Sequence, residues 1–171
     1  LNLIGGFQAE NAMVAAGLAI ASGCDSDEVL MVLPKLKPVR GRMQLAATRE
    51  NGAAVFVDYA HTPDAVSTAL QALRPHVMGR LVVVLGAGGD RDTTKRPLMG
   101  EAATAHADLV FVTDDNPRTE DPAVIRTAVM LGAPEAFEVA DRAEAILRAV
   151  DALGPGDALL IAGKGHETGQ I

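Results

Sequence analysis

One short segment constrains the fold of this chain more than any other: an apolar run that leads directly into a charged loop. Residues 109–112 read Leu-Val-Phe-Val, and residues 113–118 read Thr-Asp-Asp-Asn-Pro-Arg. A short β-branched run without polar interruption is typical of a strand covered on both faces of a parallel sheet. In such sheets ligands bind beyond the carboxyl ends of the strands. We therefore expect the loop that ends at Arg118 to border a ligand site.

The side chains of this loop suit a ligand that carries charges of both signs. Asp115 supplies acceptor oxygens, Asn116 an amide and Arg118 a guanidinium, while Pro117 stiffens the backbone. The alternative is an Asx-Pro turn whose arginine only faces solvent. The loop by itself does not decide between the two interpretations.

From residue 43 onward the chain alternates strand and helix patterns. Residues 43–49 and 53–58 are β-like and are separated by Asn51-Gly52, the signal of a two-residue hairpin. Further strands are expected at residues 81–85, 136–139 and 158–162. Helix N-caps are supplied by Thr62, Asp121 and Asp141. The alternation predicts an α/β fold, a Rossmann-like and mostly parallel sheet of about six strands with an N-terminal β-hairpin.

The first 40 residues have a different character. Residues 7–22 are alanine-rich with a wide apolar stripe that stops at Gly23, which predicts a mostly buried helix. A second, short helix is expected, capped by Asp25 or Ser26 and closed by Pro34. Because no strand accompanies these helices, we interpret residues 1–40 as the helical remnant of an upstream domain followed by a basic, proline-rich linker. The second domain is expected to span residues 41–171.

Composition limits the classes of function that are plausible. The 171 residues carry a formal charge of −7, which argues against a broad nucleic-acid or anionic-membrane surface. No apolar run of about 20 residues and no signal peptide is present, so we expect a cytoplasmic protein. The single Cys24 has no His or Cys neighbours for a metal and is interpreted as a packing residue.

Four of the expected strands end in polar, glycine-bearing or charged loops, at residues 58–64, 86–92, 114–118 and 163–167. In a parallel sheet these loops share one edge, which predicts an active site there. The run from Gly86 to Gly89 lacks the third glycine of a dinucleotide fingerprint. We expect these glycines instead to let backbone N–H groups approach an anion, with charge added by Arg91, Lys95 and Arg96.

Five motifs in these loops, taken in order, resemble the C-terminal domain of the Mur ligases, and most closely the MurE type that adds 2,6-diaminopimelate. They are Asp58-Tyr59-Ala60-His61-Thr62-Pro63-Asp64, Gly88-Gly89-Asp90-Arg91-Asp92, Lys95-Arg96-Pro97-Leu98-Met99-Gly100, Asp114-Asp115-Asn116-Pro117-Arg118 and Gly163-Lys164-Gly165-His166-Glu167. The resemblance covers about residues 5 to 171. It implies an ATP-dependent peptide-bond-forming ligase of peptidoglycan precursor synthesis, in which ATP phosphorylates a D-glutamyl carboxylate and the incoming amine attacks the acyl phosphate.

The resemblance also implies roles for individual residues. Those that would bind diaminopimelate are Arg91, Asp115, Asn116, Pro117, Arg118, Gly163 and Glu167. Those that would face the nucleotide are Asn11, Arg42, Asp58 and His61. Without the resemblance, the sequence leaves three roles open for His61: a general base, a nucleotide contact or a residue that organises its loop. The resemblance assigns no catalytic residue and no metal ligand within this chain.

ATP and Mg²⁺ would be held mainly by an upstream ATPase domain, because no G-x-x-x-x-G-K-[ST] phosphate loop occurs in the sequence. We therefore expect this chain to be a C-terminal part of the ligase, shortened at its own C-terminus and inactive alone. Its small-molecule partners would be diaminopimelate, a UDP-linked muramoyl dipeptide and ATP. Two alternatives remain: a Mur ligase that adds lysine or another amino acid, and a stand-alone α/β module that binds a small molecule or nucleotide without catalysis.

Overall fold

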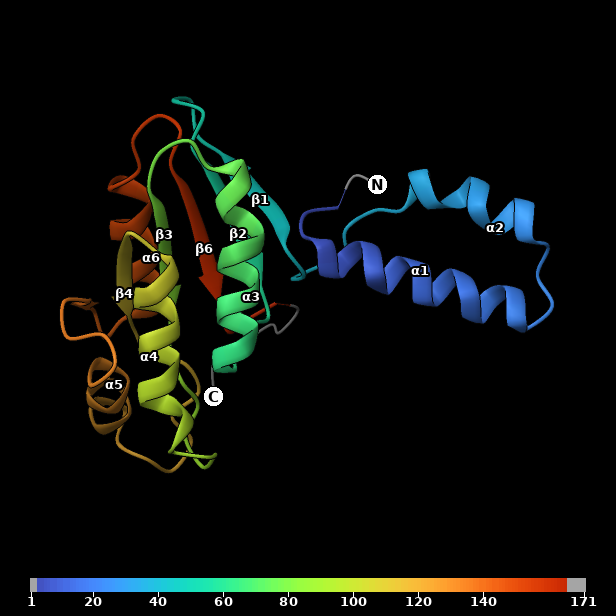
Figure 1. Cartoon of the computed structure of the whole chain (residues 1–171). Coiled ribbons are helices and arrows are strands. Elements are labelled where there is room, and N and C mark those ends of the chain that lie inside the picture. The colour runs from blue at the N-terminus through green and yellow to red at the C-terminus, as the bar shows by residue number, and fades with distance from the viewer. Residues whose placement is uncertain (1–2, 166–171) are drawn as a thin grey trace. The chain divides into compact units, whose positions relative to one another are not determined.

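The structure is a computed structural model that describes residues 3–165. The chain divides into two compact units, Leu1–Val39 and Arg40–Ile171, and each is described here by itself (Figure 1). No helix in the described part of the chain is long and apolar enough to cross a membrane.

The first unit is a helical pair, α1 (Gly6–Ala21) and α2 (Ser26–Val32), followed by the 3-10 turn η1 (Leu33–Lys35). Asp25 caps α2 as expected: its carboxylate accepts hydrogen bonds from the backbone N–H groups of Asp27 and Glu28, both at 3.0 Å. Both ends of α1 lie within one residue of their expected positions, and α2 begins directly after its cap.

The expectation that α1 is mostly buried is wrong within this unit. Only Ala12 and Ala16 are buried among its residues, whereas Met13, Val14 and Leu18 are each more than half exposed. The physical reason is that α2, with seven residues, is too short to cover more than one stripe of the longer helix.

The second unit is built on a six-stranded sheet in the order β1-β2-β6-β3-β4-β5. Its strands are β1 (Gln44–Thr48), β2 (Ala54–Asp58), β3 (Leu81–Leu85), β4 (Leu109–Val112), β5 (Phe137–Glu138) and β6 (Ala158–Ala162). β1 pairs antiparallel with β2, and the other four adjacent pairs are parallel. The predicted fold class is therefore confirmed.

Four α-helices cover this sheet: α3 (Pro63–Leu73), α4 (Lys95–His106), α5 (Pro122–Met130) and α6 (Arg142–Asp151), with a 3-10 turn η2 (Arg74–His76) after α3. The side chains of Thr62, Asp121 and Asp141 cap α3, α5 and α6 as the sequence predicted. α3 and α4 lie side by side on one face, and α6 packs against β3, β4 and β6 on the other (Figure 1).

The core follows from this layering. All five residues of β3 are buried, as expected for a central strand with helices on both faces. On the α6 side, the small residues Ala145 and Ala149 let the helix approach Val82, Val84 and Leu159 closely. Parallel strands in register then carry their carboxyl ends to one edge of the sheet.

The hairpin between β1 and β2 differs from the two-residue turn that Asn51-Gly52 predicted. The Arg49 N–H donates to the Ala53 carbonyl at 2.8 Å, so three residues form the loop, and Gly52 occupies the left-handed region with φ of 86°. The Asn51 side chain donates to the Leu153 carbonyl at 3.0 Å. This tertiary contact beyond α6 anchors the longer loop, and no local pattern encodes it.

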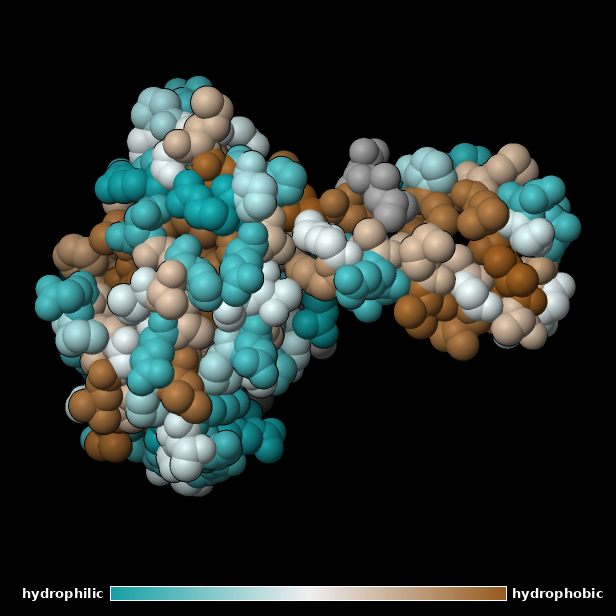
Figure 2. All heavy atoms as spheres, in the orientation of Figure 1, coloured by the Kyte–Doolittle hydropathy of each residue, from teal (hydrophilic) through white to brown (hydrophobic). Residues whose placement is uncertain are grey.

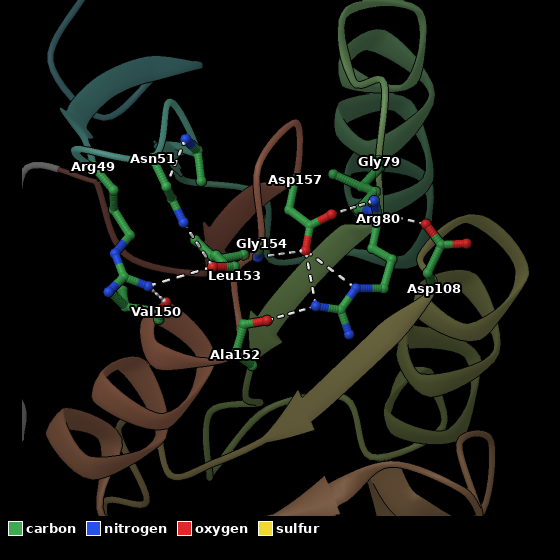
Figure 3. Close-up of polar contacts among 12 residues, drawn as sticks. Arg49, Asn51, Gly79, Arg80, Asp108, Val150, Ala152, Leu153, Gly154 and Asp157 are labelled. Carbon is green, nitrogen blue, oxygen red and sulfur yellow. Dashed lines mark hydrogen bonds and ion pairs between the residues drawn. The ribbon is translucent and has the colours of Figure 1, made fainter.

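A polar network fastens the amino-terminal ends of β3 and β6, at the edge opposite the four loops (Figure 3). The buried Asp157 carboxylate accepts from the backbone N–H groups of Arg80, at 2.6 Å, and Gly154, at 2.9 Å. The Arg80 guanidinium adds an ion pair at 2.8 Å. Burial alone would raise the pKa of Asp157, but these hydrogen bonds outweigh it and hold the pKa below the ordinary value of 3.8.

Candidate functional site

The loops that follow β2, β3, β4 and β6 surround one cavity of about 230 Å³. The expected convergence of these four loops at one edge of the sheet is thus confirmed. The cavity is bordered by Tyr59, His61, Gly86, Ala87, Gly88, Arg91, Lys95, Asp115, Asn116, Arg118 and Gly163. Three cationic side chains and one carboxylate therefore meet there.

Arg118 is held at the cavity by its own loop and by the loop after β3. Its Nη1 donates to the Gly89 carbonyl at 2.7 Å and lies 3.3 Å from the Asn116 carbonyl oxygen. Its backbone has φ of 52°, in the left-handed region that non-glycine residues seldom adopt. Such a conformation persists only where the surroundings fix it, so the side chain is presented in a defined place.

Two glycines of the loop after β3 allow close contacts between loop backbones, and the expected approach of this loop to an anion stays a prediction. A Cβ on Gly89 would lie 1.9 Å from the Pro117 carbonyl oxygen, and one on Gly86 would lie 2.5 Å from the Thr113 carbonyl oxygen. The Gly89 N–H also donates to the Asn116 carbonyl at 2.8 Å. These glycines let two loop backbones touch, and the Gly89 N–H is already used within the protein.

Arg96 does not border the cavity, so the expectation that it adds charge there is wrong. Its side chain is 3% exposed and pairs with Glu120 at 2.8 Å. Glu120 also accepts from the Asp90 N–H at 2.6 Å, and the hydrogen bond from Arg96 is the main cause that lowers the pKa of Glu120. The pair clamps α4 to the two loops that carry Arg91 and Arg118.

The two neighbouring aspartates of the central loop have separate environments. Asp114 pairs with Arg126 of α5, which also contacts Glu138 at 2.8 Å. Burial alone would lower the pKa of Arg126, but these two carboxylates raise it above its ordinary value. Asp115 is buried against the cavity, 3.3 Å from the Nζ of Lys164. Asp114 therefore fixes the base of the loop, and Asp115 belongs to the site.

Gly163 and Lys164 join the loop after β6 to the loop after β4. Gly163 has φ of 94°, and a Cβ there would lie 3.2 Å from the Oδ2 of Asp115. The Lys164 ammonium lies 3.0 Å from the Oδ1 of Asn116. A larger residue at position 163 would push against the buried carboxylate, so glycine suits this position for two independent reasons.

Tyr59, His61 and Lys95 line another part of the cavity, and Arg42, which is not among the lining residues, contacts Tyr59. The rings of Tyr59 and His61 meet edge to face at 4.8 Å between centroids, and the Arg42 guanidinium lies 4.8 Å from the Tyr59 ring centroid. The Nδ1 of His61 is 2.9 Å from the Tyr59 carbonyl oxygen, which only accepts, so Nδ1 carries the proton of this contact. Lys95 reaches the His61 carbonyl at 3.3 Å.

Asp58 lies at the end of β2 but does not border the cavity. Its carboxylate accepts from the backbone N–H groups of Met43, at 2.7 Å, and Ala60, at 2.8 Å. Burial raises the pKa of Asp58, although these hydrogen bonds and the nearby Arg42 charge oppose the shift. The side chain ties the segment before β1 to the wall that holds Tyr59.

Two other predicted residues of the described chain are absent from the cavity lining. Asn11 is exposed on α1 in the other unit, Pro117 contacts Gly89 rather than the cavity, and Glu167 lies outside the described residues. Lys95 borders the cavity, as expected for a residue that adds charge there, whereas Tyr59 and Lys164 belong to the quoted motifs but were assigned no role at the site. Their signal was their position in loops that follow strands.

Within residues 3–165 no group of three or more His, Cys, Asp or Glu side chains is placed to hold a metal ion. Gly86 and Gly89 lie close to the Thr113 and Pro117 carbonyls, so part of the glycine-bearing loop is used in contacts between loops. What the site offers is a small basic and polar cavity suited to a zwitterionic ligand.

Comparison with known proteins agrees with this geometry. Residues 41–165 match the family described as Mur ligase, glutamate ligase domain. The chain is 58% identical, over all 171 residues, to a UDP-N-acetylmuramoyl-L-alanyl-D-glutamate–2,6-diaminopimelate ligase of Bradyrhizobium diazoefficiens, and 58% identical to the enzyme of that name from Zymomonas mobilis. In both cases it spans 35% of the relative's length.

Solved structures show the same relationship. A structure of a UDP-N-acetylmuramoyl-L-alanyl-D-glutamate–2,6-diaminopimelate ligase is similar over 98% of this chain and 35% of its own, with a TM-score of 0.73 and 42% identity. A folylpolyglutamate synthase of Mycobacterium tuberculosis, solved with ADP and AMPPCP, is similar over 96% of this chain and 39% of its own, with a TM-score of 0.75 and 25% identity.

Proposed function

The chain belongs to the Mur ligase family, and from that membership we propose that it is the part of a diaminopimelate-adding ligase that holds the incoming amino acid. The chain spans about a third of the length of the curated relatives it matches, so the ligase reaction belongs to a longer protein. In that reaction, ATP would activate the D-glutamyl carboxylate of a UDP-linked muramoyl dipeptide, and diaminopimelate would be the acceptor. We place this precursor synthesis in the cytoplasm.

The composition of the cavity wall is the observation that carries the proposal. Arg91, Lys95 and Arg118 border it together with Asp115 and Asn116. Diaminopimelate has two carboxylates and two ammonium groups, so it needs cationic donors and at least one anionic acceptor. A guanidinium binds a carboxylate through two parallel hydrogen bonds, and a buried carboxylate suits an ammonium. Arg118 is therefore proposed to bind one carboxylate and Asp115 to face an ammonium.

The chemical task of these residues is to bind and orient. A carboxylate is a poor electrophile until one oxygen becomes a phosphate leaving group, and ATP bound with Mg²⁺ supplies that chemistry. The sequence contains no G-x-x-x-x-G-K-[ST] motif, and we therefore assign ATP and Mg²⁺ mainly to the part of the ligase outside this chain. Holding the acceptor amine in a fixed place contributes to the rate by removing the entropy cost of a bimolecular encounter.

We further propose that residues 1–40 complete the ATPase domain of the longer protein, with Asn11 and Arg42 facing its nucleotide. The support is the unburied apolar surface of α1, where Met13, Val14 and Leu18 are exposed (Figure 2). Exposed apolar residues on one helix are typical of a surface that packs on another part of a protein.

The test is an assay of the full-length ligase that carries this chain. Phosphate release should depend on the muramoyl dipeptide, ATP, Mg²⁺ and diaminopimelate together, and lysine should be a very poor acceptor. Equal use of lysine would favour the lysine-adding alternative. The 171-residue chain alone should bind ATP weakly in calorimetry, whereas tight, magnesium-dependent binding would support the stand-alone nucleotide module.

A further inference from the structure

The contact between Lys164 and Asn116 has a defined donor and a defined acceptor. Its Nζ lies 3.0 Å from the Oδ1 of Asn116 and 3.3 Å from the Oδ1 of Asp115. An ammonium donates hydrogen bonds and accepts none, so the Asn116 atom that faces it must be the amide oxygen. The amide NH₂ of Asn116 is then turned to the side away from Lys164.

We propose that Lys164 is a positioning residue that sets the orientation of the Asn116 amide and so selects what this side chain recognises. Asn116 borders the cavity, and with its oxygen committed to Lys164 it offers the ligand a donor. The favoured ligand group is a carboxylate. An amide turned the other way would present an acceptor and would suit an ammonium instead. This inference rests on the proposed function for the identity of the ligand.

The contact with Asp115 gives Lys164 a second effect in the same direction. The side chain of Asp115 is 9% exposed and that of Lys164 is 19% exposed, so the pair is shielded from solvent. The ammonium at 3.3 Å attracts the Asp115 carboxylate and holds it on the side of Lys164. Lys164, in the loop after β6, therefore fixes the amide donor of Asn116 and the carboxylate acceptor of Asp115, two adjacent residues of the loop after β4.

The kinetic experiment uses the full-length ligase with Lys164→Met, Lys164→Arg and Asn116→Ala. Lys164→Met should raise the KM for diaminopimelate about tenfold, with kcat and the KM for ATP changed little, because one charge-assisted contact is lost. Lys164→Arg should restore most of the affinity, since a guanidinium also only donates. Arg148→Met, an exposed cation on α6, is the matched control and should leave all three constants unchanged.

A double-mutant cycle separates positioning from general stabilisation. The part of the loss that passes through Asn116 should disappear in the Asn116→Ala background, so Lys164→Met should cost less there than in the native one, where the contact with Asp115 adds to the loss. Additive losses would overturn the proposal. So would a fall in melting temperature for Lys164→Met without any change in the KM for diaminopimelate.

A spectroscopic readout on the 171-residue chain does not depend on activity. The Asn116 side-chain ¹³Cγ and ¹⁵Nδ2 resonances should shift in Lys164→Met and stay near their native positions in Lys164→Arg. Unchanged resonances in Lys164→Met would refute the amide orientation. If the native ligase failed to use diaminopimelate, the proposed function would fall, while these resonances would still decide the orientation.

Discussion

Replacement of Arg118 by alanine is the sharpest test of the acceptor site. The contacts of Nη1 with the Gly89 and Asn116 carbonyls hold the guanidinium, which has five N–H donors in all. We expect the donors beyond Nη1 to bind the side-chain carboxylate of diaminopimelate, the group that lysine lacks. Arg118→Ala should therefore weaken this acceptor selectively.

The magnitude follows from the type of bond. Hydrogen bonds to charged groups contribute about 1.5–3 kcal/mol, which corresponds to a rise of roughly 10- to 150-fold in the KM for diaminopimelate. The KM for ATP should change little. A site that hydrogen-bonds a substrate group can discriminate against an analogue without that group by a factor of up to about 10⁴ in kcat/KM. The preference for diaminopimelate over lysine should therefore be markedly smaller in the variant.

The assay is steady-state phosphate release by the full-length ligase, with diaminopimelate and lysine each titrated at saturating ATP. Arg118→Lys should rescue little, because a point charge does not reproduce the planar fork. Arg148→Ala serves as the matched arginine control: it is exposed on α6 and pairs only with Glu144 four residues away among the salt bridges found. If Arg118→Ala kept its discrimination against lysine, the role assigned to this loop would be wrong.

Three further predictions concern stability and dynamics. Asp157→Ala should lower the free energy of unfolding by about 2–4 kcal/mol in denaturant titrations, because two backbone N–H donors lose their acceptor. Since the pKa of Asp157 in the folded state lies below 3.8, the stabilisation by its carboxylate should be complete above pH 3.8 and should disappear as the pH falls through the folded-state pKa. The native protein should therefore lose more stability in acid than Asp157→Asn does, and equal losses would contradict this prediction. Glu120→Gln should lower the melting temperature more than Glu144→Gln, because it leaves the buried Arg96 guanidinium without its counter-charge, and equal shifts would show that the clamp is unimportant. Amide exchange should be faster in α1 than in β3, and uniform protection would show that the helical unit is as stable as the sheet.

Much of the fold could be predicted from the sequence because its determinants are local. The uninterrupted apolar run of β3 favours a strand buried on both faces, and Asp121 followed by Pro122 supplies a favourable helix start. Once strands and helices alternate, parallel pairing brings the loop ends to one edge. The convergence of Arg91 and Arg118 on one cavity follows from that topology.

The direction of each polar side chain was decided only by tertiary structure. Arg91 and Arg96 are five positions apart and have the same charge, yet Arg91 borders the cavity while Arg96 is buried against Glu120. Asp114 and Asp115 are adjacent, and Arg126 and Lys164 from distant segments give them separate partners. A sequence pattern does not reveal which distant residue will neutralise a charge.

The length of the β1 to β2 loop illustrates the same physical limit. Asn51-Gly52 satisfies the local rule for a two-residue turn, but a hydrogen bond to the Leu153 carbonyl accompanies the three-residue loop. Sequence alone thus determined backbone periodicity, helix starts and the edge at which the loops meet, since these depend on residues a few positions apart. Long-range pairing of charges and amides settled the rest, because the energy of a polar group depends on the partner that folding brings to it.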